Sequence, residues 1–441
     1  MPSGHGGTGG CKAMRAEVVS VSQDYESPAG GTRLMERIAN PNNLTRAFQR
    51  VKRNKGAAGI DRMTVEGLYT HLQEHGHELR QCLLQGEWRP APVRRVLIPK
   101  PDGGERQLGI PIALDRMVQQ AIQQVLQAEW ELRFSSFSYG FRPNRSAHQA
   151  INQAQSYIRE GYNWVVDIDL SKFFDRVNHD RLMAKLAVHT DDKDVLRLIR
   201  RFLQSGVMEN GLVKPQTEGV PQGGPLSPVL SNIVLDELDK ELEKRDLRFV
   251  RYADDCRVFV RSKKAGERVM ASLTRYIESK LKLKVNVAKS AVDKAWRRAF
   301  LGYSFTRDGR KKLADKTCKR FRDKVKQLTR KGGRSLEQRL ESLNRYLRGW
   351  KNYFREVETR SEFENFDCWI RRRLRSLLWY QWKKSPKRYA ELRRRGVSEE
   401  LTRQTVGSSK GYWRISRSPA LHLTLPNSWF DELGLIRLLA A

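Results

Sequence analysis

Two adjacent carboxylates, Asp254 and Asp255, stand between two short runs of apolar residues. These runs have the length and composition of two strands joined by a tight turn. Two carboxylates crowded at one turn repel each other, and one tends to stay protonated unless a cation joins them. Mg²⁺ is the cation that such a cluster of oxygen ligands favours. An isolated Asp-Asp pair on a turn is most often ordinary turn chemistry, so the pair needs a further acid before it indicates a metal site.

A further acid, Asp169, lies upstream at the end of a strand-like segment, residues 164–170. Apolar residues alternate along this segment, as in a half-buried strand, so Asp167 and Asp169 share the opposite face. Two metal ions about 3.5–4 Å apart can lower the pKa of an attacking hydroxyl and stabilise a leaving oxygen. Asp169, Asp254 and Asp255 are therefore the predicted catalytic residues and metal ligands of a nucleotidyl-transfer site.

The charge of the chain predicts a polyanionic partner. Net charge is +33 over 441 residues, and residues 291–441 contribute +22 of it. Nucleic acid is favoured over a membrane, because no apolar run approaches about 20 residues. A chain of this length has room for two or three domains.

The cysteines and histidines do not suggest a structural metal or a disulfide framework. Five cysteines include no Cys-x-x-Cys pair, which argues against both and is typical of a cytoplasmic protein. His71, His75 and His77 lie in a polar helical stretch without a matching ligand pattern. Residues 1–33 are rich in glycine and small polar types without an apolar segment, which predicts a disordered leader and no secretion signal.

A basic hairpin is predicted at residues 93–110, with its turn at residues 101–104. Lys100 and Arg106 lie near its tip. They are either the protective charges of a solvated edge strand or a clamp on the oxygens of a nucleoside triphosphate. Their place upstream of an acidic site favours the clamp.

Two loops carry residues that suit contact with nucleic acid or nucleotide. Residues 138–146 interleave glycine, aromatic and arginine residues, which fits either template contact or a structural loop. Residues 217–228 form a Pro/Gly-rich loop in which Gln222 can offer an amide to a sugar or base. Ser227 as N-cap and Pro228 at the first position predict that a helix begins there. Helices are also expected at residues 34–51 and 115–130.

The last third of the chain is predicted to be helical. Two apolar and aromatic stripes, residues 336–354 and 366–378, indicate a helix-bundle core rather than base-stacking platforms. The arginines on the other faces of these helices, and residues 371–373 within the second stripe, are interpreted as a nucleic-acid surface. Residues 410–414 are again basic and aromatic.

The order of these motifs resembles that of the group II intron-encoded reverse transcriptases, from about residue 34 to the C-terminal end. The compact type that lacks an endonuclease is most similar, because no Cys-pair nuclease module follows. The resemblance implies an α+β fold of the right-hand polymerase type: fingers and palm with an antiparallel sheet, then an α-helical thumb. The implied divisions are 34–92 for an N-terminal extension and the start of the fingers, 93–310 for fingers and palm, 311–395 for the thumb (maturase domain), and 396–441 for a segment resembling a DNA-binding region.

The resemblance also implies roles for individual residues. Asp169, Asp254 and Asp255 match the metal ligands, and Leu170 would add its backbone carbonyl. Four positions match contacts to the incoming nucleotide or its leaving group: Lys100, Arg106, Gln222 and Lys289. Phe174 falls where an aromatic gate excludes the ribose 2′-hydroxyl, and Phe173 is adjacent. Residues 300–305 resemble a primer grip.

The implied function is RNA-directed DNA synthesis with two Mg²⁺ ions and deoxynucleoside triphosphates, joined to splicing of a parent intron RNA. Partners would be that RNA as template, a DNA or RNA primer, and a DNA target. Three alternatives stay open: an RNA-binding maturase with vestigial polymerase activity, a related enzyme recruited to phage defence or a CRISPR locus, and an RNA-templated RNA polymerase, which the bulk of Phe174 disfavours. The sequence does not determine the oligomeric state.

Overall fold

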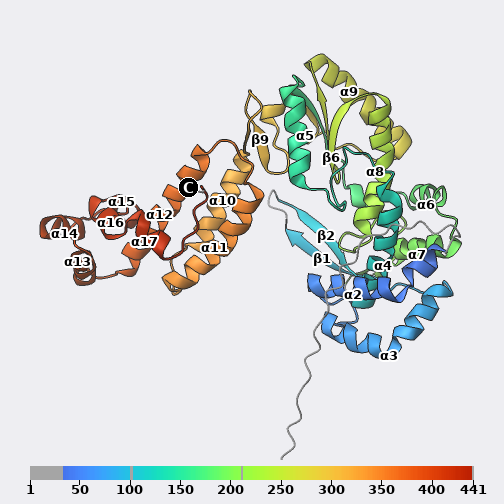
Figure 1. Cartoon of the computed structure of the whole chain (residues 1–441), viewed down its shortest axis with the longest axis horizontal. Helices are drawn as coiled ribbons and strands as arrows, with labels where there is room; N and C mark the ends of the chain where they lie inside the picture. Colours follow the sequence, from blue (N-terminus) through green and yellow to red (C-terminus); the bar gives the residue numbers. More distant parts are fainter. Residues whose placement is uncertain (1–32, 100–102, 210–211, 440–441) are drawn as a thin grey trace, which may run out of the picture.

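The computed structural model describes residues 33–99, 103–209 and 212–439. Figure 1 shows these residues as two lobes: a larger lobe of helices and sheets, and an elongated helical lobe formed by the last third of the chain. This arrangement confirms the predicted α+β class with a helical C-terminal region. The predicted disordered leader, residue Lys100 and part of the hairpin turn lie outside the described residues.

Helices form the base of the larger lobe. They are α1 (Leu34–Ile38), α2 (Pro41–Asn54), α3 (Val65–Leu84) and α4 (Ala113–Glu131). The single helix predicted at residues 34–51 is wrong, because the chain divides there into two helices. Asn40 caps the second helix by accepting a hydrogen bond from the Asn42 amide at 2.9 Å, and Pro41 takes the first helical position. The predicted helix at 115–130 is confirmed as α4, whose apolar stripe is buried.

The hairpin of residues 93–110 belongs to a four-stranded sheet in the order β2-β1-β4-β5. Its strands are β1 (Val93–Pro99), β2 (Glu105–Ile110), β4 (Val207–Glu209) and β5 (Leu212–Lys214). β1 and β2 pair antiparallel with Ile98 opposite Arg106, which confirms the predicted hairpin and places Arg106 close to its tip.

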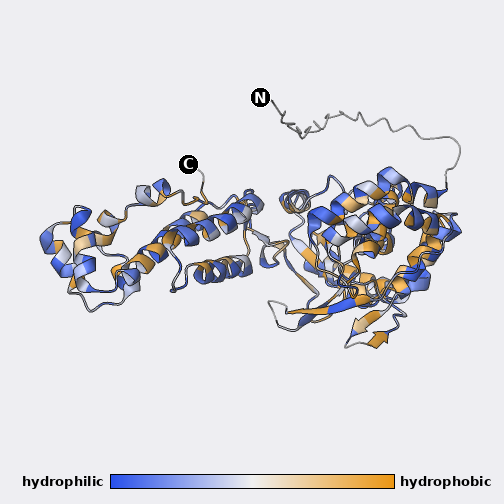
Figure 2. Ribbon diagram, turned by 90° about the horizontal axis from the view of Figure 1, so that it is seen from below, coloured by the Kyte–Doolittle hydropathy of each residue, from blue (hydrophilic) through white to orange (hydrophobic). Residues whose placement is uncertain are grey.

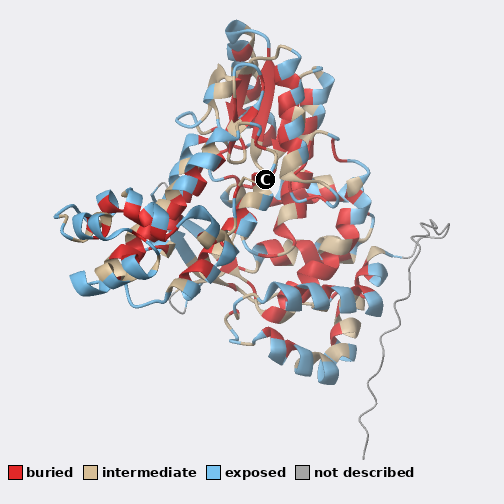
Figure 3. Cartoon of the chain, turned by 60° about the vertical axis from the view of Figure 1, so that its left-hand side comes forward, coloured by how far each residue is buried: buried red, intermediate tan, exposed pale blue. Residues whose placement is uncertain are grey.

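The second four-stranded sheet is antiparallel throughout, in the order β6-β7-β3-β8. Its strands are β3 (Trp164–Ile168), β6 (Arg248–Tyr252), β7 (Asp255–Val260) and β8 (Ala291–Lys294). Helix α5 (Ala147–Arg159) contacts β6 and β7. Helix α8 (Ser227–Lys244) contacts β6, and α9 (Lys263–Tyr276) contacts β3, β7 and β8. Figure 3 shows the strands of this sheet as largely buried, and β3, β6 and β7 are the buried ones, whereas β8 is half-buried.

β3 is more deeply buried than its alternating pattern predicts. Val166 packs in one core cluster with α8 and α9, and Val165 packs in a second cluster with α5. Both side chains are almost fully buried. Helices cover the sheet on both faces, so apolar residues are accommodated on each side of the strand.

Three further helical segments connect the sheets: η1 (Phe173–Asp175), α6 (His179–Ala187) and α7 (Lys193–Gln204). The predicted helix start at residue 228 is confirmed by α8, but the predicted cap is wrong. Ser227 is the first helical residue and makes no cap hydrogen bond. Its hydroxyl donates instead to the Pro221 carbonyl at 2.5 Å, which fastens the preceding loop to the helix.

After the segments η2 (Ile277–Leu281) and η3 (Ala295–Arg297), a small sheet of β9 (Tyr303–Phe305) and β10 (Lys311–Leu313) leads into the helical lobe. Its main helices are α10 (Asp315–Leu328), α11 (Leu336–Tyr353) and α12 (Ser361–Gln381). The predicted aromatic core is confirmed: Phe321 lies with its ring 4.4 Å from those of Trp350 and Phe366. Figure 2 shows apolar residues facing the interior of both lobes.

The last elements pack back on the helical lobe. They are α13 (Ser385–Arg394), α14 (Glu399–Val406), α15 (Tyr412–Ile415), α16 (Pro419–Thr424) and α17 (Asn427–Glu432). Leu421 and Phe430 share a core cluster with α11 and α12, and the Leu438 amide donates to Asp367 of α12 at 3.0 Å. Among the described helices, none is long and apolar enough to cross a membrane.

Candidate active site

The sheet of β6, β7, β3 and β8 brings the three predicted acids to one edge. Ile168 pairs with Cys256 in the register of β3 and β7, and Tyr252 pairs with Asp255 across the β6–β7 turn. Asp169 therefore leaves β3 at the level where Asp255 begins β7, with Asp254 on the intervening turn. The backbone of Asp169 is fixed by Ser290, whose hydroxyl accepts from the Asp169 amide at 3.0 Å.

Burial raises the pKa of both acids on the turn. It raises the pKa of Asp254 above its ordinary range; the negative charge of Asp169 raises it further, and Arg106 and Arg251 oppose this. Burial likewise raises the pKa of Asp255, against the opposing charge of Arg257. The coupling of Asp254 to both Asp169 and Arg106 places the acidic edge within electrostatic reach of the basic hairpin.

The three carboxylates do not close around one point. Within residues 33–99, 103–209 and 212–439, no group of three His, Cys, Asp or Glu side chains is arranged to hold a metal ion. Asp255 is engaged elsewhere, because Arg257 Nε donates to its Oδ1 at 3.4 Å. The chemistry of the donors nevertheless fits divalent cations, because carboxylates of like charge lie at one partly buried edge and a cation would offset their repulsion.

A buried polar network supports the acidic turn from below. Arg251 is fully buried and forms a two-point ion pair with Asp239 of α8, at 2.7 and 2.5 Å. Its Nη1 also donates to the Asn232 side chain and to the Ala253 carbonyl, both at 2.9 Å. Asn232 in turn donates to the Gly140 carbonyl at 2.9 Å. The network joins α8, the 138–146 loop and the turn into one unit.

The turn itself is held in a tight conformation. Ala253 has φ of 58°, a left-handed value that favours glycine. Gly140 packs so closely against it that a Cβ on Gly140 would lie 2.2 Å from the Ala253 amide nitrogen. This network was not predicted from the sequence. Its signal there is the pair of polar residues, Asn232 and Asp239, spaced seven apart on the apolar face of a helix.

Asp167, predicted to share a face with Asp169, has a different environment. It is almost fully buried and accepts from Arg298 at 2.6 Å and from Arg257 at 3.3 Å. Arg257 also lies 4.7 Å from the centre of the Phe300 ring. These contacts link Asp255, through Arg257, to the turn that resembles a primer grip.

Two adjacent phenylalanines differ in exposure. Phe173 is buried in the core, whereas Phe174 is only partly buried, and their rings lie 5.1 Å apart. Of the two, Phe174 is the one that a ligand can reach. Its carbonyl accepts from the Val220 amide at 2.6 Å, so η1 is tied to the loop of residues 217–228.

The remaining predicted residues are spread around the acidic edge. The Gln222 carbonyl accepts from the Gly109 amide at 2.8 Å, and Gln222 lines a cavity of about 160 Å³ between its loop and β2. Leu170 forms an isolated antiparallel β-bridge with Val285. Its two hydrogen bonds run from the Asn286 amide to the Asp169 carbonyl and from the Ser171 amide to the Lys284 carbonyl. Lys289 is exposed, and its carbonyl accepts from Arg298 at 2.8 Å.

The sequence of the 138–146 loop fits either template contact or a structural role, and different residues of the loop fit each interpretation. Arg142 is buried, pairs with Glu131 at 2.8 Å and donates to the Ser138 carbonyl at 2.7 Å, which are structural contacts. Tyr139 is also buried. Phe141 is 47% exposed and is the aromatic residue of this loop that is open to a partner.

The arginines of residues 371–373 are not the open surface that their sequence indicates. Arg371 is buried and pairs with Asp431 of α17 at 3.2 Å. Arg372 lies over the Trp413 ring, 3.7 Å from its centre, and Arg373 Nε donates to Thr329 at 2.8 Å. The prediction fails for Arg371, because a helix packed on both sides turns some of its cations inward to bind neighbouring elements.

Comparisons with known proteins match both lobes. Residues 98–305 match the family described as reverse transcriptase (RNA-dependent DNA polymerase), and residues 318–396 match the group II intron, maturase-specific domain. The protein YkfC of Escherichia coli is 34% identical over 300 residues, covering 59% of this chain and 79% of YkfC.

Two further matches are partial. The group II intron-encoded protein LtrA of Lactococcus lactis is 35% identical over 223 residues, so the match spans 50% of this chain but 37% of LtrA. A telomerase structure from Candida albicans is similar with a TM-score of 0.41 and 16% identity, over 65% of this chain and 59% of that one. With both domain matches in their expected order and most of one relative aligned, the chain belongs to the group II intron-encoded reverse transcriptase/maturase family.

Proposed function

We propose that this protein is an RNA-directed DNA polymerase that extends a primer 3′-hydroxyl with deoxynucleoside triphosphates. The observation that carries the proposal is the register of β3, β6 and β7, which brings Asp169, Asp254 and Asp255 to one edge. The match of residues 98–305 to reverse transcriptases supports it. Residues 93–310 would form fingers and palm, and residues 311–395 the thumb.

Asp169, Asp254 and Asp255 would hold two Mg²⁺ ions, with the Leu170 carbonyl as a further ligand. When bound, the ions would lower the pKa of the primer hydroxyl and offset charge on the leaving pyrophosphate. To join such a site, the Asp255 carboxylate would exchange its 3.4 Å contact with Arg257 for the cation. Arg251 and Asp239 keep the turn in place during that exchange.

Other side chains would bind and orient the nucleotide. Arg106, whose positive charge lowers the pKa of Asp254, would neutralise triphosphate oxygens together with Lys100. Phe174 would abut the sugar and exclude a 2′-hydroxyl, and Gln222 would contact the sugar or base. Lys289 would serve the leaving pyrophosphate only if its exposed side chain turns toward the acids.

We propose a second role in splicing, in which the protein binds its parent intron RNA. The match of residues 318–396 to the maturase-specific domain supports this role. The partners would then be the intron RNA as template, a DNA or RNA primer and a DNA target. A purified intron transcript from the same locus should splice faster with the wild-type protein, and also with a variant that cannot polymerise. Equal splicing with and without protein would remove this role.

Primer extension on an RNA template with Mg²⁺ tests the polymerase. Wild-type protein should yield full-length DNA, and Asp254→Ala should yield none while binding the RNA as tightly as wild type. Asp191→Asn is the matched control, because Asp191 is an exposed acid in the loop before α7. No synthesis by wild type, with RNA binding retained, would leave the alternative of a maturase with vestigial polymerase activity.

A further inference from the structure

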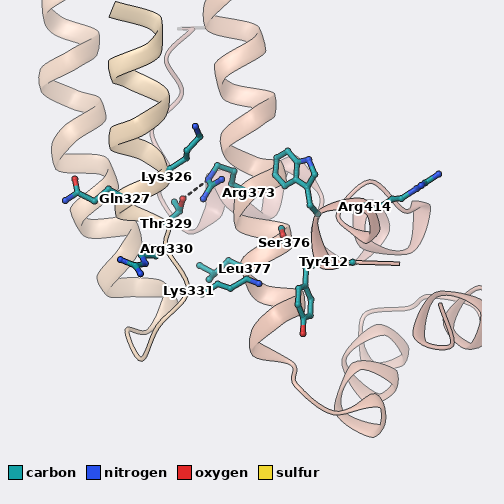
Figure 4. A pocket seen from close by; sticks show the side chains of 12 residues that line it. Lys326, Gln327, Thr329, Arg330, Lys331, Arg373, Ser376, Leu377, Tyr412 and Arg414 are labelled. Carbon is teal, nitrogen blue, oxygen red and sulfur yellow. Dashed lines mark hydrogen bonds between the residues drawn. The ribbon is translucent and has the colours of Figure 1, made fainter. Parts of the chain in front are cut away.

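A basic, aromatic groove lies in the helical lobe, apart from the acidic edge. It has a volume of about 990 Å³ and is formed by the end of α10, the middle of α12 and the start of α15. Figure 4 shows the side chains that line it. Its wall therefore combines segments more than 80 residues apart in the sequence.

Positive charge dominates this groove. Five of its twelve lining residues are cations, namely Lys326, Arg330, Lys331, Arg373 and Arg414. No aspartate or glutamate is among the lining residues. Within the part of the chain that the structure describes, Arg330, Lys331 and Arg414 form no ion pair. Lysine and arginine that converge without carboxylates are a binding surface for phosphates.

Aromatic rings lie among these cations. Trp413 remains 40% exposed although the Arg372 guanidinium lies 3.7 Å from its ring centre. Lys331 Nζ lies 4.4 Å from the centre of the Tyr412 ring and 4.5 Å from that of Tyr380. The cations thus border the rings, so a phosphate bound by Lys331 would lie beside Tyr412.

This combination selects unpaired nucleic acid. Bases in a duplex stack on one another and offer no free face to a side chain, whereas single-stranded bases can stack on aromatic rings. A groove that only neutralised phosphates would not need an exposed tryptophan side chain next to a half-buried tyrosine.

We propose that the groove between α10, α12 and α15 binds a single-stranded stretch of nucleic acid, with phosphates on Lys331, Arg330 and Arg414 and a base against Tyr412 or Trp413. The inference extends the proposed function by giving the helical lobe a site for an unpaired strand. Its test measures binding without synthesis, so that it can fail while the polymerase proposal stands.

The test uses the full chain, first saturated with an unlabelled primer–template duplex to fill the polymerase cleft. A short fluorescent oligouridylate is then titrated and followed by anisotropy. Trp413→Ala and Lys331→Gln should each weaken binding about fivefold or more. The lysine variant should also lower the slope of log affinity against log salt by about 0.7. Tyr389→Ala and Lys319→Gln are matched controls outside the groove and should leave the affinity unchanged.

Photocrosslinking with 4-thiouridine in the same oligonucleotide locates the site. Adducts should map to the peptide that contains Tyr412 and Trp413, and unchanged melting temperatures should show that the variants fold. A DNA oligonucleotide of the same sequence shows whether the groove distinguishes RNA from DNA. Tighter binding of the RNA would identify RNA as the ligand, and equal binding would show that the groove recognises the phosphates and bases that both share. Equal affinity for a blunt duplex, equal losses in the control variants, or adducts confined to other peptides would overturn the proposal.

Discussion

Charged residues are organised in opposite ways at the acidic edge of the larger lobe and in the helical lobe. Under the acidic turn, the cation Arg251 is buried and fully paired, while among the described residues Asp255 has one partner, Arg257, and Asp169 and Asp254 form no ion pair. In the helical lobe, Arg371 is buried and paired with Asp431, while Lys331 and Arg414 remain at the groove. In each region the paired charges hold the fold together, and the unpaired ones identify the site and the sign of its ligand.

The ion pair under the turn should give the largest effect. Arg251→Met leaves Asp239 buried without its partner, so we expect the free energy of unfolding of the larger lobe to fall by about 3–5 kcal/mol. Urea denaturation followed by tryptophan fluorescence measures the loss. Arg181→Gln, which breaks an exposed pair with Glu237, should cost less than about 1 kcal/mol. Similar losses in both variants would show that the buried pair contributes no more than a surface pair.

Arg371 sharpens the comparison within the helical lobe. Because it is buried against Asp431, Arg371→Gln should lower the free energy of unfolding by about 2 kcal/mol and leave the salt dependence of RNA binding unchanged. Urea denaturation measures the free energy of unfolding, and fluorescence anisotropy at several salt concentrations measures the salt dependence of RNA binding. A variant with wild-type stability but a reduced salt slope would show that Arg371 contacts nucleic acid.

Phe174 tests whether the partly buried ring next to the acidic edge contacts the sugar. Phe174→Val should raise the use of ribonucleotides relative to deoxynucleotides about tenfold, since a smaller side chain leaves room for a 2′-hydroxyl. Single-nucleotide incorporation kinetics measure the ratio. Phe141→Val, a change at an exposed phenylalanine, should leave it unaltered. If Phe174→Val discriminates between ribonucleotides and deoxynucleotides as well as the wild type does, Phe174 does not exclude the 2′-hydroxyl.

Asp115 provides a third arrangement, a buried acid bound by neutral donors alone. It accepts from Trp88 Nε1 at 3.0 Å and from the Ala91 amide at 2.8 Å, and burial raises its pKa to about 7. The unfolded chain releases this proton near the ordinary value of 3.8. Folding therefore retains a proton between these values, and the contribution of Asp115 to stability is lost as pH rises from about 4 to about 7.

Between pH 5.5 and 6.5, the free energy of unfolding of the wild type should accordingly fall by about 1 kcal/mol relative to that of Asp115→Asn. Above about pH 8, where Asp115 is ionised in the folded state as well, the difference should be constant. Thermal unfolding of both proteins across this range checks the slope, and parallel curves would place the pKa of Asp115 outside it.

Much of the site could be predicted from the sequence because it depends on local pattern. Alternation along residues 164–170 identifies a strand that ends at Asp169, and apolar runs around Asp254 and Asp255 identify a hairpin. Antiparallel pairing of such strands leaves few ways to arrange their ends. The helical stripes likewise predicted which aromatics form the core of the second lobe.

The partners of buried polar residues could not be predicted in this way. Periodicity shows which face of a helix is buried, but not which residue from another element meets it. Thus Arg251 with Asp239, Arg371 with Asp431, and Ser227 with the Pro221 carbonyl emerge only when distant segments come together. The break before Pro41 has a signal in the sequence, the cap residue Asn40 followed by proline, but the apolar spacing continues across it.

Single-turnover primer extension by Asp169→Asn, Asp254→Asn and Asp255→Asn tests the central claim most directly. If the three acids act as one cation site at the palm edge, each change should slow nucleotide incorporation at least about a hundredfold. Asp191→Asn should keep the wild-type rate, and RNA affinity should be equal in all four variants. A variant among the three that incorporates nucleotides within a few-fold of wild type would contradict the account.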